Sequence, residues 1–173
     1  MEQHRVTSSS EPSVPHSAWD AEDTLTFLPL PQQRPALLPE KPALPTGVTV
    51  THSSRFSVPA SGDAALSART VARSVLKLLL GASENAERTT RRVETCLAEL
   101  VAVAYTRTSG SYLVCELGSD SEHVFVTVEH QEALPTRADE TTIGLNLVKT
   151  IADDYGTHIV SGDYHTWAAV RRV

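Results

Sequence analysis

Glu99 and Val103 are the residues whose types and spacing bear most directly on chemistry in this chain. They lie four residues apart in a stretch whose apolar residues repeat with a helical period, and positions i and i+4 share one face of a helix. Glu99 brings a carboxylate to that face. Val103 brings a hydrocarbon without a lone pair, so it cannot ligate a hard cation that takes oxygen ligands. Any chemistry at this pair therefore lacks a metal ligand at position 103.

The two cysteines, Cys96 and Cys115, do not have the spacing of a metal site or of a redox motif. Cys96 falls on the apolar side of the expected helix, and Cys115 falls inside a strand pattern. Both are therefore interpreted as buried thiols, and no metal site is predicted.

Charge and composition narrow the function classes. The 173 residues contain 15 Lys and Arg against 21 Asp and Glu, a net charge of −6, which favours solubility and argues against a nucleic-acid surface. The basic cluster Arg88, Arg91 and Arg92 is interpreted as a solvated helix face. No apolar run approaches the roughly 18 residues of a membrane span, and no apolar core follows Met1–Arg5 as in a secretion signal. A cytoplasmic protein without nucleic-acid or membrane partners is expected.

Composition changes near residue 50. Eight of the ten prolines fall between Pro12 and Pro45, and such a segment buries too little apolar surface to offset the entropy of ordering. Residues 1–52 are therefore predicted to be a disordered tail, followed by one domain over 53–173. Within the tail, acids alternate with large apolar residues over 19–30, which suits a docking motif; a passive tail is the alternative.

The first half of the domain is predicted to contain a strand and two helices. Arg55–Val58 alternates as a short strand. One helix ends at Gly81, and the next begins at Ser83 or Asn85. The apolar residues that predict the first helix are Leu66, Val71, Val75, Leu78 and Leu79. Those that predict the second follow a 3.6-residue period and are Val93, Cys96, Leu97, Leu100, Val101 and Ala104.

The second half adds four strands and a helix. The predicted segments are strands Tyr112–Leu117 and His123–Glu129, a polar loop 131–142, a helix with Leu145, Val148, Ile151 and Ala152 that ends near Gly156, and a hairpin of 157–160 with 166–170. Strands joined by tight turns are antiparallel. The expected fold is an α+β two-layer α/β sandwich, with a mostly antiparallel mixed sheet covered on one face by about three helices.

Three stretches resemble the GHKL (Bergerat-fold) ATPases, and among them the small bacterial anti-sigma-factor serine kinases. They are Val93–Ala104, Ile143–Val148, and Tyr155–Gly156 with Thr166–Ala168. The second is the most specific, because a Gly-Leu-x-Leu-Val helix start after a polar loop is unusual. The resemblance covers residues 54–173 and implies a histidine kinase-like ATPase domain.

In that family the first of these helices supplies a Glu and, four residues later, an Asn. The Glu is a general base for the attacking hydroxyl, and the Asn holds the magnesium ion that bridges the ATP phosphates. By resemblance Glu99 is the candidate base. Val103 stands where the Asn is expected, so metal and triphosphate binding should both be impaired.

The resemblance also places an adenine-reading Asp, followed by glycines, after the strand that ends near residue 129. His130 is nearest to that Asp position, and Glu129 lies one residue early; a one-residue bulge would bring Glu129 into register. Gln131 and Glu132 replace the glycines.

The remaining nucleotide positions are mixed. Gly144 begins a helix whose backbone N–H groups can hold an anion, and Leu145 follows it in the motif. The glycine that precedes it in the family corresponds to Thr142 or Thr141. Thr166 matches a family threonine near the nucleotide.

Each candidate also has a structural interpretation. Glu99 can be a solvent-facing helix residue, Gly144 can allow close packing of a helix start, and Thr166 can be a core residue of a strand. His130 and His165 are interpreted as a loop and a hairpin-end histidine. Together these features predict a fold better than an activity.

Two function classes follow, and the first is favoured because metal ligand, adenine acceptor and glycines are all altered. The first is a degenerate anti-sigma-factor kinase-like regulator that binds proteins, with weak or no ATP binding and no cofactor; the resemblance suggests sigma factors or their small antagonist proteins as partners, and a homodimer. The second is an active serine kinase that uses ATP and Mg²⁺, with Glu99 as base and Glu129 in place of the Asp. A third, weaker option is a two-layer domain of other ancestry.

Overall fold

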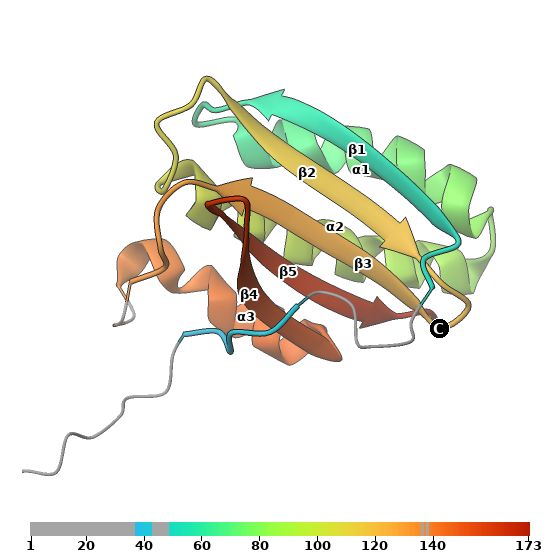
Figure 1. Ribbon diagram of the computed structural model, residues 1–173. Helices are drawn as coiled ribbons and strands as arrows, with labels where there is room; N and C mark the ends of the chain where they lie inside the picture. The colour runs from blue at the N-terminus through green and yellow to red at the C-terminus, as the bar shows by residue number, and fades with distance from the viewer. Residues whose placement is uncertain (1–36, 43–48, 136, 138) are drawn as a thin grey trace, which may run out of the picture. The chain divides into compact units, whose positions relative to one another are not determined.

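The computed structural model describes residues 37–42, 49–135, 137 and 139–173, which all fall in a compact unit that begins at Arg34. Five strands form one sheet in the order β1-β2-β3-β5-β4, with each neighbouring pair antiparallel (Figure 1). The strands are β1 His52–Pro59, β2 Tyr112–Ser119, β3 His123–His130, β4 Asp154–Val160 and β5 Asp163–Arg171. The helices are α1 Ala64–Leu80, α2 Glu84–Tyr105 and α3 Gly144–Ile151, with a 3₁₀ turn at Glu140–Thr142.

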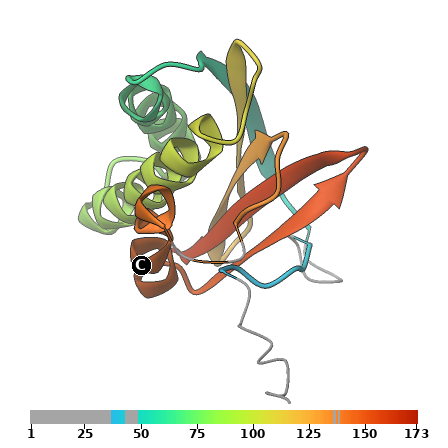
Figure 2. The same cartoon turned by 90° about the vertical axis from the view of Figure 1, so that its left-hand side faces the viewer.

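The helices all lie on one face of the sheet (Figure 2). This confirms the α+β two-layer sandwich with three helices. Among the described residues, strand pairing in the parallel sense occurs at an isolated bridge between Glu40 and Thr157, at the outer edge of β4. None of the described helices is long and apolar enough to cross a membrane.

The predicted stripe of α2 is confirmed. Its six apolar residues are each no more than 1% exposed. The Ser83 side chain accepts a hydrogen bond of 3.1 Å from the backbone N–H of Ala86, which caps the start of the helix. Both cysteines are fully buried, and burial raises the pKa of each thiol to about 12.

The helix predicted to end at Gly81 is confirmed as α1, but the apolar residues that predicted it are not its most buried ones. Leu66 and Leu78 are 64% and 88% exposed, whereas a row of small residues faces the core. The buried residues are Ala64, Ala68, Ala72 and Leu76, spaced four apart. Small side chains allow a close approach to α2.

The end of α3 also differs from the prediction. The helix stops at Ile151, and Gly156 lies inside β4. Arg92 holds that end, because its Nη2 donates to the Ile151 carbonyl at 2.6 Å and to Asp153 at 3.4 Å. The sequence suggested that Arg92 belongs to a solvated helix face, but its guanidinium is bonded to the end of α3.

The hairpin of β4 and β5 is longer than predicted, since its strands begin at Asp154 and Asp163. Val160 pairs with Asp163 across a two-residue loop. Ser161 and Gly162 in this loop have φ angles of 54° and 99°. Positive φ at both positions is the requirement of a type I′ turn.

The predicted tail 1–52 includes residues 37–42, which pack against the outer edge of β4. We call residues 37–42 the strap. Leu38 in the strap is 2% exposed and belongs to the main core. The docking motif predicted at 19–30 lies outside the described residues, and the predicted disorder of residues 1–36 and 43–48 stays a prediction.

Candidate functional site

Glu99 and Val103 have different surroundings although they lie one helical turn apart. Val103 is 2% exposed and belongs to the main hydrophobic core. Glu99 is half-buried and lies against the start of α3. Among the described residues, Glu99 makes no hydrogen bond or ion pair. Val103 is thus a core residue, and the Glu99 carboxylate lies beside α3 without a bonded partner among the described residues.

Glu99 leaves no room for a side chain at position 144. A Cβ atom built on Gly144 would overlap the Glu99 carboxylate and would lie 3.2 Å from the Glu99 Cβ. The carboxylate therefore sits at the N-terminal end of α3, where negative charge is favourable. The backbone N–H groups at the start of α3 were predicted to hold an anion, and the Glu99 carboxylate lies against that position.

His130 is the last residue of β3 and is 2% exposed, so its interpretation as a loop histidine is wrong. Its Nδ1 lies 2.7 Å from the Glu132 carbonyl, and its Nε2 lies 2.7 Å from the Thr166 hydroxyl. The carbonyl can only accept, so Nδ1 carries the proton and Nε2 accepts from Thr166. Burial lowers the pKa of His130, helped by His165 and Arg107 and opposed by its bond to Glu132.

Tyr164 completes this group of residues. Its ring stacks on the His130 ring, with centroids 5.7 Å apart and an interplanar angle of 11°. Thr166 is 2% exposed. His130, Tyr164 and Thr166 thus form a closed polar group on the helix-covered face, in which both ring nitrogens of the histidine are already bonded.

Glu129 lies on the opposite face of the sheet. The β3–β5 ladder runs without a bulge, pairing Glu129 with His165 and His130 with Tyr164. The Glu129 carboxylate accepts a hydrogen bond of 2.6 Å from Arg55. The bulge required to bring Glu129 beside Thr166 is therefore absent, and the structure does not bring these two residues together.

His165 is a strand residue within β5, and its interpretation as a hairpin-end histidine is wrong. It stacks on His158 of β4, with ring centroids 5.3 Å apart. Both rings lie on the face that the helices leave uncovered. Burial and the neighbouring His165 lower the pKa of His158.

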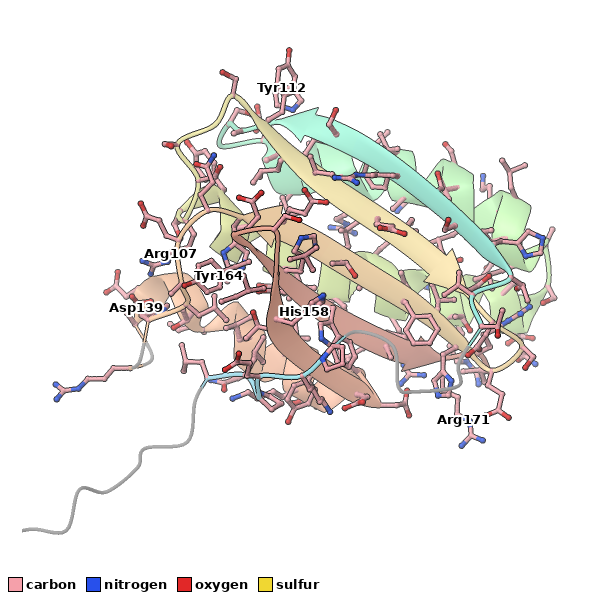
Figure 3. All side chains as sticks on the ribbon, viewed as in Figure 1. Arg107, Tyr112, Asp139, His158, Tyr164 and Arg171 are labelled. Carbon is pink, nitrogen blue, oxygen red and sulfur yellow. The ribbon has the colours of Figure 1, made fainter. Side chains whose placement is uncertain are left out.

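The loop 131–142 is held by Arg107 and Asp139 (Figure 3). The backbone carbonyl of Arg107 accepts hydrogen bonds from the N–H groups of Gln131 and Glu132. The side-chain Nη2 of Arg107 lies 3.4 Å from the Asp139 carboxylate. The Thr142 hydroxyl lies 3.1 Å from the same carboxylate and is buried. The loop start and the approach to α3 are thereby tied to the end of α2.

Leu145, the last of the predicted positions, is 1% exposed and packs in the main core. Sequence reasoning missed Arg107, Tyr164 and Leu38. No motif marked the first two. The Leu37–Leu38 pair between prolines was the available signal for the third.

A cavity of about 370 Å³ opens between the strap, the loop and the β4–β5 hairpin. Its lining is largely apolar. The lining residues are Leu37, Leu38, Glu40, Ala133, Leu134, Pro135, Thr157, His158, Ile159 and Tyr164. In the described part of the chain, no group of three or more His, Cys, Asp and Glu is arranged to hold a metal ion.

ATP and magnesium, which the resemblance implies, do not fit these residues. The position of the expected metal ligand is a core valine, the histidine at the adenine position is bonded internally, and the helix start is covered by Glu99. Of the carboxylate and amide pair that the resemblance implies, the half-buried carboxylate of Glu99 is present, and Val103 offers no oxygen to a hard cation.

Comparisons with known proteins find a likeness in structure and none in sequence. No family model matches the chain, and no curated protein matches it. The chain is similar to a solved structure of the RsbU and RsbW domains of Rv1364c from Mycobacterium tuberculosis, with 13% sequence identity and a TM-score of 0.47. The likeness covers 70% of this chain and 32% of that chain.

Proposed function

We propose that this protein is a non-catalytic relative of the anti-sigma-factor serine kinases, of the GHKL superfamily, and that it regulates transcription by binding proteins. The sequence resemblance over residues 54–173 supports the kinship, and the α+β order of elements agrees with it. On this proposal its partners are sigma factors or the small antagonist proteins of such kinases.

The observation that carries the loss of catalysis is the bonding of His130. Both of its ring nitrogens have partners at 2.7 Å within the protein, and one partner is the threonine expected to contact nucleotide. Binding adenine there would require breaking a buried hydrogen bond, which leaves a buried polar group unsatisfied. Val103 adds a second obstacle, because it is buried in the core and offers no oxygen to magnesium.

A working kinase is the second candidate, and one observation favours it. Glu99 keeps a half-buried carboxylate that has no ionic partner among the described residues, so it is available to accept a proton as a general base. Against this candidate, Glu129 is held by Arg55 on the other face of the sheet.

Calorimetry of the full chain with Mg-ATP and with Mg-ADP separates the two candidates. We expect no measurable binding up to millimolar nucleotide, with an active anti-sigma-factor serine kinase as the positive control. A dissociation constant in the low micromolar range, or transfer of labelled phosphate to a serine substrate, would support the kinase. Capture of a purified sigma factor or antagonist protein, unchanged by added Mg-ATP, is the positive result that the proposal requires.

A further inference from the structure

The strap pairs with the outer edge of β4 as an added strand. The Lys41 N–H donates to the Thr157 carbonyl at 2.8 Å, and the Thr157 N–H donates to the Pro39 carbonyl at 2.9 Å. The two segments run parallel around Glu40 and Thr157. This is the hydrogen-bond pattern of an extended peptide that is added to a sheet edge.

The edge is shaped for such a peptide at Gly156. A Cβ atom there would lie 2.9 Å from the Pro39 carbonyl and 3.0 Å from the Trp167 Nε1. The indole of Trp167, which is 1% exposed, donates at 2.8 Å to the Lys41 carbonyl. The glycine therefore leaves the space through which the strap backbone reaches the indole.

Two side chains of the strap enter matching surroundings. Leu38 is buried in the main core and lines the cavity of about 370 Å³. The Lys41 ammonium contacts the Asp154 carboxylate and lies 5.4 Å from the centroid of the Trp167 ring. The site thus combines an aliphatic socket, a carboxylate and an aromatic face.

The described residues of the strap pair with one part of this edge. Its described pairing is limited to the bridge at Thr157, although β4 continues to Val160. Because strand groups alternate, Ile159 presents its N–H and C=O on the same edge as Thr157. The Ile159 side chain is 54% exposed. A segment whose pairing extends to Ile159 would add hydrogen bonds to those described at Thr157.

We propose that the β4 edge is a binding site for an extended segment of a partner protein, and that the strap fills this site in cis until the partner displaces it. The recognised segment has an aliphatic residue followed by proline, with a basic residue three positions after the aliphatic one, as in Leu38, Pro39 and Lys41. This site differs from the candidate nucleotide site and does not depend on its loss of function.

Binding of a labelled peptide to the full chain tests the proposal. The probe is Ala-Leu-Leu-Pro-Glu-Lys-Pro-Val-Thr, which copies residues 36–42 and adds two residues that can pair beyond Thr157. Leu38→Asp removes the cis competitor from its socket. We expect this variant to bind the probe at least tenfold more tightly than the unchanged chain does, by fluorescence anisotropy.

The matched controls change the edge and the probe. Adding Gly156→Val to Leu38→Asp should abolish binding, because the new side chain meets the Pro39 position of the peptide. A probe with Asp in place of its second leucine should not bind. Hydrogen exchange at the Thr157 amide should be slow in the unchanged chain, fast in Leu38→Asp, and slow again with the probe.

Three results would overturn the proposal. The first is a folded Leu38→Asp variant that does not bind the probe, and the second is binding that survives Gly156→Val. The third is a dimer of the unchanged chain that exchanges straps, which would assign the edge to a second copy. If Leu38→Asp does not fold, Lys41→Ala replaces it; losing the contact with Asp154 should tighten probe binding about threefold, and no change would count against the site.

Discussion

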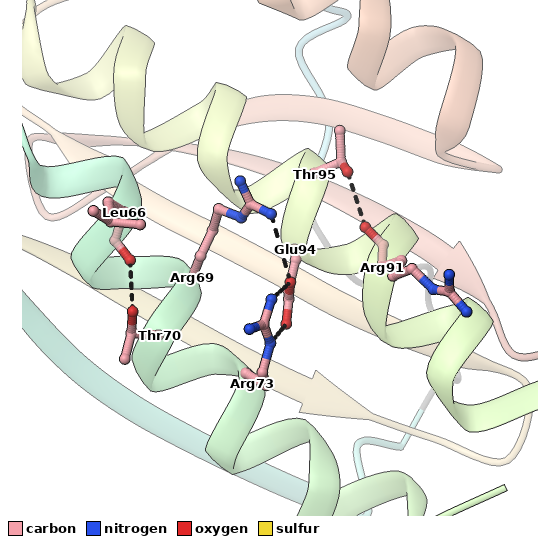
Figure 4. Close-up of polar contacts among 7 residues, drawn as sticks. All are labelled: Leu66, Arg69, Thr70, Arg73, Arg91, Glu94 and Thr95. Carbon is pink, nitrogen blue, oxygen red and sulfur yellow. Dashed lines mark hydrogen bonds and ion pairs between the residues drawn. The ribbon is translucent and has the colours of Figure 1, made fainter. Parts of the chain in front are cut away.

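Glu94 and Glu99 lie on the same helix, five residues apart, and the structure treats their carboxylates differently. Glu94 is 2% exposed and accepts two hydrogen bonds of 2.7 Å from Arg73, with Arg69 at 3.9 Å (Figure 4). Glu99 is half-buried and faces the start of α3 without an ionic partner among the described residues. The Glu94 carboxylate forms ion pairs that join α2 to α1, whereas the Glu99 carboxylate forms no ion pair with a described residue.

The fold requires the ion pairs of Glu94, whereas it only tolerates the Glu99 carboxylate, which is unpaired among the described residues. A buried carboxylate persists only when it is paired, so Glu94 and the arginines of α1 form a structural unit. A half-exposed carboxylate can remain without a partner, because water solvates it. The retention of Glu99 is therefore weak evidence for catalysis, and the substitutions below test whether this half of α2 still behaves as a site.

Val103→Asn is expected to have the largest effect. It introduces the residue type that the resemblance places there, but it puts an amide where the side chain is 2% exposed. The lost apolar burial and the unsatisfied amide should together cost about 3 kcal/mol or more. Chemical denaturation measures the loss, and Val103→Ala is the control that removes hydrocarbon without adding a polar group. If Val103→Asn were as stable as the unchanged chain and bound Mg-ATP, the helix would still carry a repairable site.

Glu94→Gln compared with Glu99→Gln tests the two carboxylates directly. The first change weakens a charge-assisted pair and should lower stability by about 1–2 kcal/mol, since both arginines remain about half exposed to water. The second should stay within about 0.5 kcal/mol. Thermal melts of the two variants at neutral pH give the comparison. Equal losses would mean that Glu99 has a structural partner after all.

The fold was predictable where large apolar residues report burial. The α2 stripe and the alternation of Val124, Val126 and Val128 in β3 placed these elements correctly. In α1, burial falls on alanines, and exposed leucines carry the stronger hydrophobic signal. The end of α3 was missed because Gly156 is needed for the approach of the strap and not for a helix end.

The site was less predictable, because its bonds join residues that are distant in sequence. His130 and Thr166 are 36 residues apart, and no local pattern announces that they bond. The face on which Glu129 lies depends on a ladder register without a bulge, which alternation alone did not decide. Leu38 was not predicted to be buried because it lies in a segment whose composition indicates disorder. Its burial, two backbone hydrogen bonds to Thr157 and the contacts of Lys41 with Trp167 and Asp154 join this segment to β4 and β5.

His130 is the counterpart of Glu94 in the candidate site, a buried polar group with internal partners. Its pKa lies below 6.5 in the folded protein, chiefly because of burial, so the unfolded chain binds its proton more readily. Stability is therefore full above about pH 6.5 and is lost as pH falls below it, by at most about 1.4 kcal/mol per pH unit for this group.

Urea denaturation between pH 7.5 and 5.5 checks this dependence. His130→Gln keeps a polar contact near Thr166 but does not titrate, so its stability should fall less on acidification than that of the unchanged chain. His158→Gln is the control, because the pKa of His158 is also lowered but its side chain is less buried. Identical pH profiles for the His130 variant and the unchanged chain would show that this ring is solvated and free to accept other partners.

Gly144→Ala in the presence and absence of Glu99 measures the smallest effect and bears on the comparison most closely. Alanine favours a helix over glycine by up to about 1 kcal/mol, but its Cβ would displace the Glu99 carboxylate. The substitution should therefore stabilise a Glu99→Ala background more than the unchanged chain, with a coupling of about 0.5 kcal/mol or more in a double-mutant cycle. The coupling stays small because a half-exposed carboxylate can rotate away. A coupling near zero would mean that Glu99 leaves α3 freely, as a working base must, and would support the kinase candidate.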